Sequence, residues 1–117
     1  MLGARALARR AGKRDRRSPM NVIRHVLIRG RVQGIGYRAF VQDLALCEGL
    51  EGWVRNRLDG RVEAVFAGPA ARVTYALDAC RRGPPGARID ALDGRDGSLA
   101  DLTHRRAGER FSVLPTV

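Results

Sequence analysis

The sequence has few of the residues that mark several common classes of protein. Aromatic residues make up only 5% of its 117 residues, which counts against a nucleic-acid module built on stacked rings. No apolar run approaches the ~18 residues that a membrane-spanning helix needs. The two cysteines, Cys47 and Cys80, lack the spacing of a zinc site or a disulfide framework. Hydrophobic residues at 44% and charged residues at 29% instead indicate one globular domain.

The positive charge is concentrated near the N-terminus. The formal net charge is +10, and residues 1–19 carry seven basic residues against one acid, Asp15. A segment this basic, with little apolar surface to bury, is predicted to lie outside the core. We therefore expect a basic, disordered extension at residues 1–20 and one domain at residues 21–117.

Three interpretations of this extension stay open. Its arginine- and alanine-rich composition is typical of an organellar transit peptide, and its charge would also suit a basic arm on an anionic partner. Alternatively, translation starts at Met20, directly before the first strand-like run. A secretory signal is excluded because the segment has no apolar central region. The domain is expected in the cytoplasm, with organellar targeting left open.

Hydrophobic periodicity predicts alternating strands and helices. Helices are expected from Tyr37 to the terminating Gly49, and from Pro69 to residue 82. The segment 93–108 is rich in Asp, Gly and Arg and is predicted to be a long mobile loop. Strands are expected at 22–29, 50–56, 61–67, 88–92 and 111–114.

This order of elements predicts an α+β ferredoxin-like two-layer sandwich, with two helices on one face of an antiparallel sheet. Val62, Ala64 and Phe66 are expected to share the inward face of their strand. His25 falls on the non-core face of the first strand and is expected to be solvated, as is His104 in the long loop. The two cysteines are expected to be buried or half-buried free thiols.

The segment 28–38 has the clearest pattern for chemistry. Gly30, Gly34 and Gly36 lie between a strand and a helix, where main-chain N–H groups have no intrahelical partner. With the helix dipole, these donors form an anion site, and Arg38 in the first helical turn can bind two phosphate oxygens. The same residues could instead form only a tight turn with a solvated arginine. The loop also lacks the Gly-Lys-Ser/Thr ending of a Walker A loop.

The local charge favours the anion site. Residues 29–38 contain three arginines and no acid, and Arg55 and Arg57 flank Asn56 at the end of the second strand. A cationic rim without counter-ions would concentrate an anionic substrate. The Asn56 amide can both accept a hydrogen bond from water and donate one.

These segments resemble the acylphosphatase family. The runs Gly30–Arg38, Gly52–Asn56 and Asp59–Glu63 carry the similarity, which extends over residues 22–114. The resemblance implies a hydrolase of carboxyl-phosphate bonds that uses no metal and no cofactor. It also implies a small acyl phosphate as substrate, with inorganic phosphate as product and competitive inhibitor.

The resemblance assigns roles to two side chains and one loop. Arg38 matches the family's phosphate-binding arginine, and Asn56 matches the asparagine that positions the attacking water. Arg57 stands where small hydroxylated residues are frequent, which leaves its role open. Trp53 is expected to cover the open sheet face, with contact to the acyl group as the alternative. The main-chain amides that match the phosphate loop are those of Arg31, Val32, Gln33, Gly34, Ile35 and Gly36.

Two other functions compete with this hypothesis. An RNA-binding domain of the same topology needs aromatic residues on its two central strands, but the first strand has none. A phosphate- or carbamoyl-phosphate-binding module, like the acylphosphatase-like domains of hydrogenase maturation proteins, would bind without turnover. From its length of 117 residues, we expect this chain not to carry the further domains of those proteins. We expect a monomeric enzyme with no membrane partner and no specific nucleic-acid partner.

Overall fold

The computed structural model describes residues 21–117, so the predicted extension at residues 1–20 lies outside the described residues. Most of the predicted elements are present, with bounds shifted by a few residues. Pro69 ends a strand, so the second helix begins one residue later than expected. The elements are β2 (Asn21–Arg31), α1 (Tyr37–Cys47), β3 (Glu51–Asn56), β4 (Val62–Pro69), α2 (Ala70–Arg82), β5 (Arg88–Asp96), α3 (Leu99–Leu102) and β6 (Phe111–Leu114).

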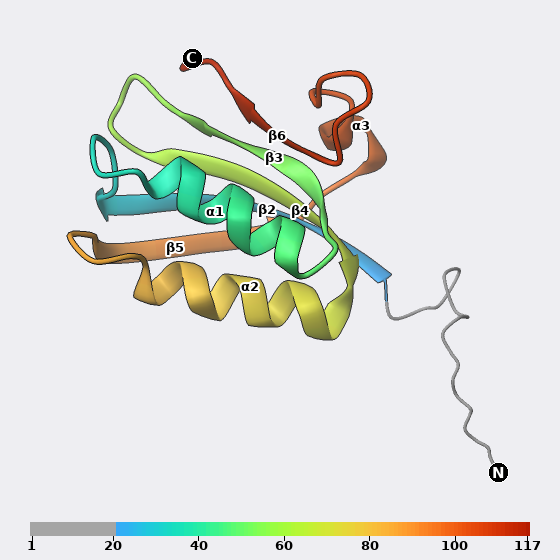
Figure 1. Cartoon of the computed structure of the whole chain (residues 1–117), viewed down its shortest axis with the longest axis horizontal. Helices are drawn as coiled ribbons and strands as arrows, with labels where there is room; N and C mark the ends of the chain where they lie inside the picture. The colour runs from blue at the N-terminus through green and yellow to red at the C-terminus, as the bar shows by residue number, and fades with distance from the viewer. Residues whose placement is uncertain (1–20) are drawn as a thin grey trace, which may run out of the picture.

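The strands form one sheet in the order β5-β2-β4-β3-β6. The pairs β2–β4, β2–β5 and β3–β4 are antiparallel, which gives the predicted ferredoxin-like arrangement. The last strand differs, because β6 runs parallel to β3. The chain leaves β5 at one edge and passes over the sheet before β6 begins at the other edge (Figure 1). The sheet is therefore mixed rather than wholly antiparallel.

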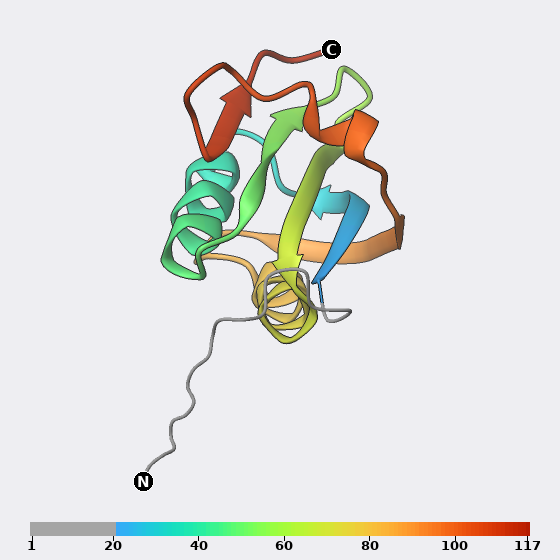
Figure 2. The same cartoon turned by 90° about the vertical axis from the view of Figure 1, so that its right-hand side faces the viewer.

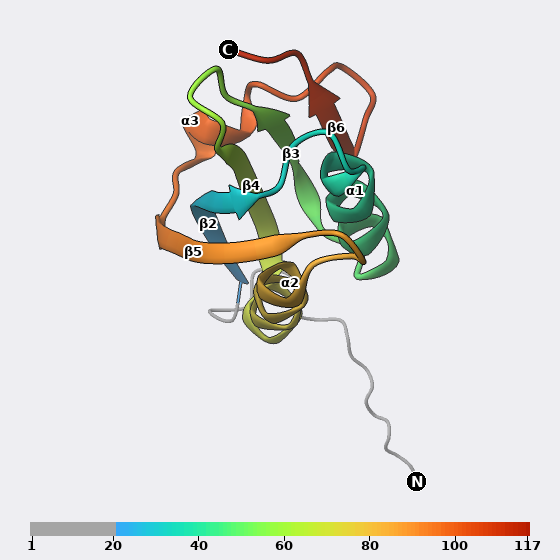
Figure 3. The same cartoon turned by 90° about the vertical axis from the view of Figure 1, so that its left-hand side faces the viewer.

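Two layers enclose the core. Figures 2 and 3 show α1 and α2 on one face of the sheet and the short α3 on the other face. The predicted inward residues Val62, Ala64 and Phe66 are fully buried. Their partners from the helices are Tyr37, Val41, Ala45, Val73, Ala76 and Cys80. No helix among residues 21–117 is long and apolar enough to cross a membrane.

The prediction of a long mobile loop at 93–108 is wrong for residues 93–96 and 99–102. The strand β5 continues to Asp96, and α3 follows with a capping box between Ser98 and Asp101. The main-chain carbonyl of Asp101 accepts a hydrogen bond of 2.6 Å from the Trp53 indole. Trp53 is 1% exposed and packs with Val65 and Leu114 on this side of the sheet. The expectation that Trp53 covers the open face is confirmed.

The two cysteines differ in exposure. Cys80 is buried in the core as expected, and burial raises the pKa of its thiol to about 12. The expectation for Cys47 is wrong, because its side chain is exposed at the end of α1.

Candidate active site

A cleft of about 290 Å³ opens where the loop before α1 meets the ends of β3 and β6. It brings together the two predicted catalytic side chains, Arg38 from α1 and Asn56 from β3, although they are far apart in the sequence. The residues that line it are Val32, Gly34, Gly36, Tyr37, Arg38, Ala39, Gln42, Asn56 and Val113.

Residues 32–36, which we call the anion loop, have a backbone that needs glycine at two positions. Gly34 has φ 78° and Gly36 has φ 81°, both in the left-handed region that other residues rarely adopt. A Cβ at either position would meet nothing within 4 Å. The backbone angle, rather than a lack of space, therefore favours glycine at both positions.

The anion loop and the start of α1 present unbonded main-chain donors. Gly36 caps α1 without any side-chain hydrogen bond. The first helical donor is the Phe40 N–H, which bonds the Gly36 carbonyl at 3.1 Å. Within the described part of the chain, the N–H groups of residues 33–39 donate no hydrogen bond. Together with the positive end of the helix dipole, they suit a phosphate-sized anion.

Arg38 brings a guanidinium to the same cleft. Its side chain is half-buried and, within residues 21–117, makes no hydrogen bond or ion pair. By contrast, the nearby Arg55, Arg57 and Arg61 each have a carboxylate partner. The charge of Arg38 is therefore available to an external anion, and its planar fork can bind two oxygens at once.

Asn56 ends β3 on the face that α1 covers, because alternate residues of a strand point to opposite faces and Val54 lies in the core. Its main-chain carbonyl accepts a hydrogen bond of 3.2 Å from the Val117 N–H. Its side-chain Oδ1 is buried and has no partner among the described residues. An unpaired buried acceptor costs about 1–3 kcal/mol. This oxygen can accept a hydrogen bond from a water that enters the cleft.

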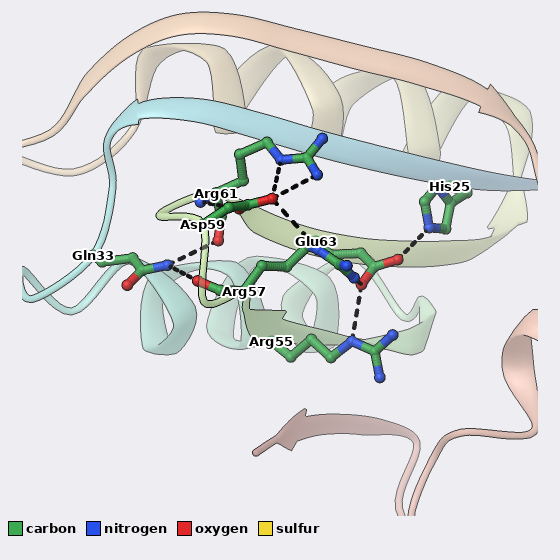
Figure 4. Close-up of polar contacts among 7 residues, drawn as sticks. All are labelled: His25, Gln33, Arg55, Arg57, Asp59, Arg61 and Glu63. Atoms are coloured by element: carbon green, nitrogen blue, oxygen red, sulfur yellow. Dashed lines mark hydrogen bonds and ion pairs between the residues drawn. The ribbon is translucent and has the colours of Figure 1, made fainter. Parts of the chain in front are cut away.

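The other predicted loop residues divide into two groups. Gly34 and Gly36 line the cleft with Val32, which is buried in the core at 1% exposure. Arg31 is exposed in the strand ladder opposite Arg88, and Ile35 packs against the core, so neither side chain lines the cleft. The Gln33 side chain also lies outside the cleft lining and bonds the β3–β4 hairpin (Figure 4).

The opposite face of the sheet carries a charge cluster that sequence reasoning missed. We call His25, Arg55, Arg57 and Glu63 the open-face cluster (Figure 4). Glu63 Oε2 lies 2.6 Å from His25 Nε2, and Glu63 Oε1 accepts hydrogen bonds of 2.9 Å from both arginines. Burial tends to raise the pKa of this carboxyl. The hydrogen bonds from His25, Arg55 and Arg57 outweigh burial and lower the pKa to about 2.

This cluster corrects two expectations. His25 is not solvated, since it is only 8% exposed and pairs with Glu63. Arg55 and Arg57 do not form a cationic rim without counter-ions, since both pair with the Glu63 carboxylate and Arg57 also lies 4.0 Å from Asp59. Glu63 stands within a strand-like run of the sequence, where no local pattern indicates its partners. The pairing of β2, β3 and β4 brings these side chains together.

The residues around the cleft provide no metal site. Within residues 21–117 no group of three or more His, Cys, Asp or Glu side chains could hold a metal ion. The cleft lining itself contains none of these residue types. The positive charge at the cleft comes from Arg38 and from the unbonded amides.

The fold is of the ferredoxin-like α+β class, and the cleft has the unbonded amides and the free guanidinium that suit a phosphate-sized anion. The family model described as acylphosphatase matches residues 24–106. Because this match spans more than half of the chain, the chain belongs to the acylphosphatase family.

Individual relatives agree with this family. An acylphosphatase from Rhodopseudomonas palustris strain BisB18 is 57% identical over 96 residues, covering 82% of this chain and 97% of the relative. One from Bradyrhizobium diazoefficiens is 56% identical over 95 residues, covering 81% of this chain and 96% of the relative. The crystal structure of an acylphosphatase from Bacillus subtilis superposes with a TM-score of 0.70 at 34% identity, covering 80% of this chain and 98% of that chain. The likeness therefore spans nearly the whole of each relative.

Proposed function

We propose that this chain hydrolyses the carboxyl–phosphate bond of acyl phosphates in the cleft between the anion loop and Asn56. Membership of the acylphosphatase family supports this activity. The observation that carries the assignment of roles is the presence, in one cleft, of unbonded amides, an unpaired arginine and an unpaired amide oxygen.

The phosphoryl group is held by the main chain and by Arg38. Amides of residues 33–39 donate to its oxygens, and the α1 dipole favours its negative charge. The guanidinium of Arg38 binds two further oxygen positions. Charge on these oxygens is neutralised by groups that are already in place, which is how enzymes stabilise a phosphoryl-transfer transition state.

The attacking water is aimed by Asn56. Its Oδ1 accepts a hydrogen bond from the water, while its Nδ2 can donate another. Fixing the water opposite the leaving oxygen converts a bimolecular attack into an oriented one. A phosphate oxygen takes the proton of the water, so no protein base is required in the cleft.

The leaving group explains why so few side chains suffice. A carboxylate has a conjugate-acid pKa of about 4, so it leaves as an anion at neutral pH without a protein acid. The described residues that line the cleft include no histidine and no carboxylate. His25 and Glu63 bond each other on the opposite face of the sheet.

We further propose that one chain is sufficient for activity and that inorganic phosphate competes with the substrate. All the lining residues of the cleft come from residues 32–113 of a single chain. We propose that the protein acts as a monomer and that it is located in the cytoplasm. Sedimentation of the active protein tests the oligomeric state, and fractionation of cells tests the compartment.

Neither alternative is favoured. Trp53 is buried rather than displayed, and β2 has no aromatic residue, so the central strands offer no platform for RNA bases. The curated relatives at 56–57% identity are themselves chains of about this length and are named for the enzyme.

Hydrolysis of benzoyl phosphate tests the proposal. The full chain is treated with a chelator and assayed with inorganic phosphate as competitor. We expect turnover that survives chelation and is inhibited competitively by phosphate. Binding of phosphate without hydrolysis would instead indicate a sensor, and activity lost on chelation and restored by a metal would contradict the proposed use of Arg38 and the amides.

A further inference from the structure

We propose that Gln33 is a positioning residue, which fixes the anion loop relative to Asn56 through its side chain. This inference rests on the proposed function, because it concerns the alignment of the phosphoryl group with the water that Asn56 aims. It also gives Gln33 a role beyond that of one more main-chain amide in the loop.

The Gln33 side chain spans the neck of the β3–β4 hairpin. Its Nε2 donates to the main-chain carbonyls of Arg57 at 2.8 Å and of Arg61 at 2.9 Å (Figure 4). The same neck is closed by a hydrogen bond of 2.8 Å from the Arg57 N–H to the Arg61 carbonyl. Both hydrogens of the Gln33 amide therefore bond the two carbonyls at the base of one turn.

The anion loop has few other restraints. Its amides from residue 33 onward are unbonded within the described residues, and Gly34 and Gly36 hold no side chain that could fix them. Among residues 21–117, no hydrogen bond or ion pair other than those of Gln33 joins residues 32–36 to residues 56–62. The position of the loop relative to the hairpin thus depends on this side chain and on apolar packing of Val32 and Ile35.

The hydrogen bond from Gln33 to Arg57 acts on Asn56 through the chain, because the two residues are neighbours. Arg57 follows Asn56 directly, and the carbonyl of Arg57 is the acceptor for Gln33. On the other side of the sheet, Glu63 holds the Arg57 guanidinium at 2.9 Å. With Arg57 fixed at both its main chain and its side chain, Asn56 is held at a set distance from the anion loop.

The proposal predicts that loss of the Gln33 side-chain bonds lowers kcat but leaves phosphate binding nearly unchanged. Loss of the Gln33 bonds leaves the amides and Arg38 able to bind phosphate, but it loosens the alignment of water and phosphorus. A misplacement of ~1 Å costs on the order of 100-fold in rate. We expect Gln33→Met, which keeps the length of the side chain and removes the donor, to lower kcat by about 10- to 100-fold. The inhibition constant of inorganic phosphate should change by less than about threefold.

A control variant removes a hydrogen bond from a side chain to the main chain at a place outside the cleft lining. Arg72 donates from Nη1 to the Glu48 carbonyl at 3.3 Å and joins α2 to the end of α1, outside the residues that line the cleft. Arg72→Met should leave both kcat and phosphate inhibition near the wild-type values. If Gln33→Met does not fold, Gln33→Asn, which keeps a donor on a shorter side chain, should show the same fall in kcat with phosphate binding nearly unchanged.

A double-mutant cycle with Asn56→Ala separates positioning from general stability. If Gln33 acts through Asn56, adding Gln33→Met to Asn56→Ala should lower kcat by no more than about threefold further. Full multiplication of the two losses, wild-type kcat in Gln33→Met, or phosphate affinity lost in step with kcat would each overturn the proposal. A wild-type protein without activity on benzoyl phosphate would instead contradict the proposed function.

Discussion

Replacement of Glu63 by glutamine tests whether the charge of this carboxylate stabilises the open-face cluster. The Glu63 side chain is 9% exposed and is the shared acceptor of His25, Arg55 and Arg57. Glu63→Gln keeps the size of the side chain but removes its charge. Arg55 would then lose its carboxylate partner, and Arg57 would keep only the Asp59 carboxylate at 4.0 Å. Removing the shared acceptor of a largely buried charge cluster is strongly destabilising.

The magnitude follows from the pKa of this carboxyl. Its hydrogen bonds outweigh burial and lower its pKa from 4.5 to about 2 in the folded protein. The ionised form therefore stabilises the fold by about 3 kcal/mol at neutral pH. Because the folded pKa is the lower one, this contribution is present above pH 4.5 and is lost as the pH falls toward about 2. We expect Glu63→Gln to lower the free energy of unfolding by about 3 kcal/mol at pH 7, and this difference should shrink in acid.

Urea unfolding of both proteins at several pH values measures this difference directly. Asp96→Asn is the control, since Asp96 pairs with Arg24 at 2.6 Å but is 92% exposed. An exposed pair contributes about 0–1 kcal/mol, so the control should unfold nearly as the wild type does. A Glu63→Gln protein as stable as the control at pH 7, or a difference that does not narrow between pH 4.5 and 2, would refute the reasoning.

Three further substitutions test the cleft and the sheet. Arg38→Lys should lose nearly all turnover of benzoyl phosphate, since an ammonium cannot form the forked contact; near-normal hydrolysis would contradict the role of Arg38. Asn56→Ala should lower kcat by a few hundredfold while the phosphate inhibition constant stays close to that of the wild type; if phosphate affinity fell equally, Asn56 would be a ligand contact. Gly52→Ala should lower the melting temperature by ten degrees or more, because a Cβ there would lie 1.8 Å from the Val65 carbonyl oxygen. An unchanged melting temperature would contradict this close approach of β3 and β4.

Local sequence patterns predicted most of the helices and strands, because hydrophobic periodicity and turn residues determine where these elements begin and end. The spacing of Tyr37, Val41 and Ala45 gives α1 one buried face, and Gly49 follows its end with a left-handed φ of 70°. Asp59 and Gly60 lie in the turn between β3 and β4, where an Asp-Gly pair is typical of a hairpin. The sequence also pointed to the glycines of the anion loop and to Arg38 at the start of α1, since a strand, a glycine-rich turn and a helix follow one another directly.

The rest depends on contacts between distant segments. His25 pairs with Glu63 because β2 and β4 lie side by side, with Leu27 opposite Glu63 in the register. A sequence pattern shows that His25 lies on the non-core face, but it does not show that the Glu63 carboxylate lies beside it on that face. The helix α3 was missed because four residues are too short for a periodic signal. Similarly, nothing near Gln33 in the sequence indicates that its side chain bonds residues 24 and 28 positions away.

Binding of inorganic phosphate, followed residue by residue, tests the central claim most directly. In a titration of isotope-labelled protein monitored by nuclear magnetic resonance, the amide signals of residues 33–39 should shift together and saturate. The same titration of Arg38→Ala should require much more phosphate. Phosphate that inhibits the enzyme while these amide signals stay unmoved, or that shifts only signals of the open-face cluster, would contradict the claim that the unbonded amides and Arg38 hold the phosphoryl group.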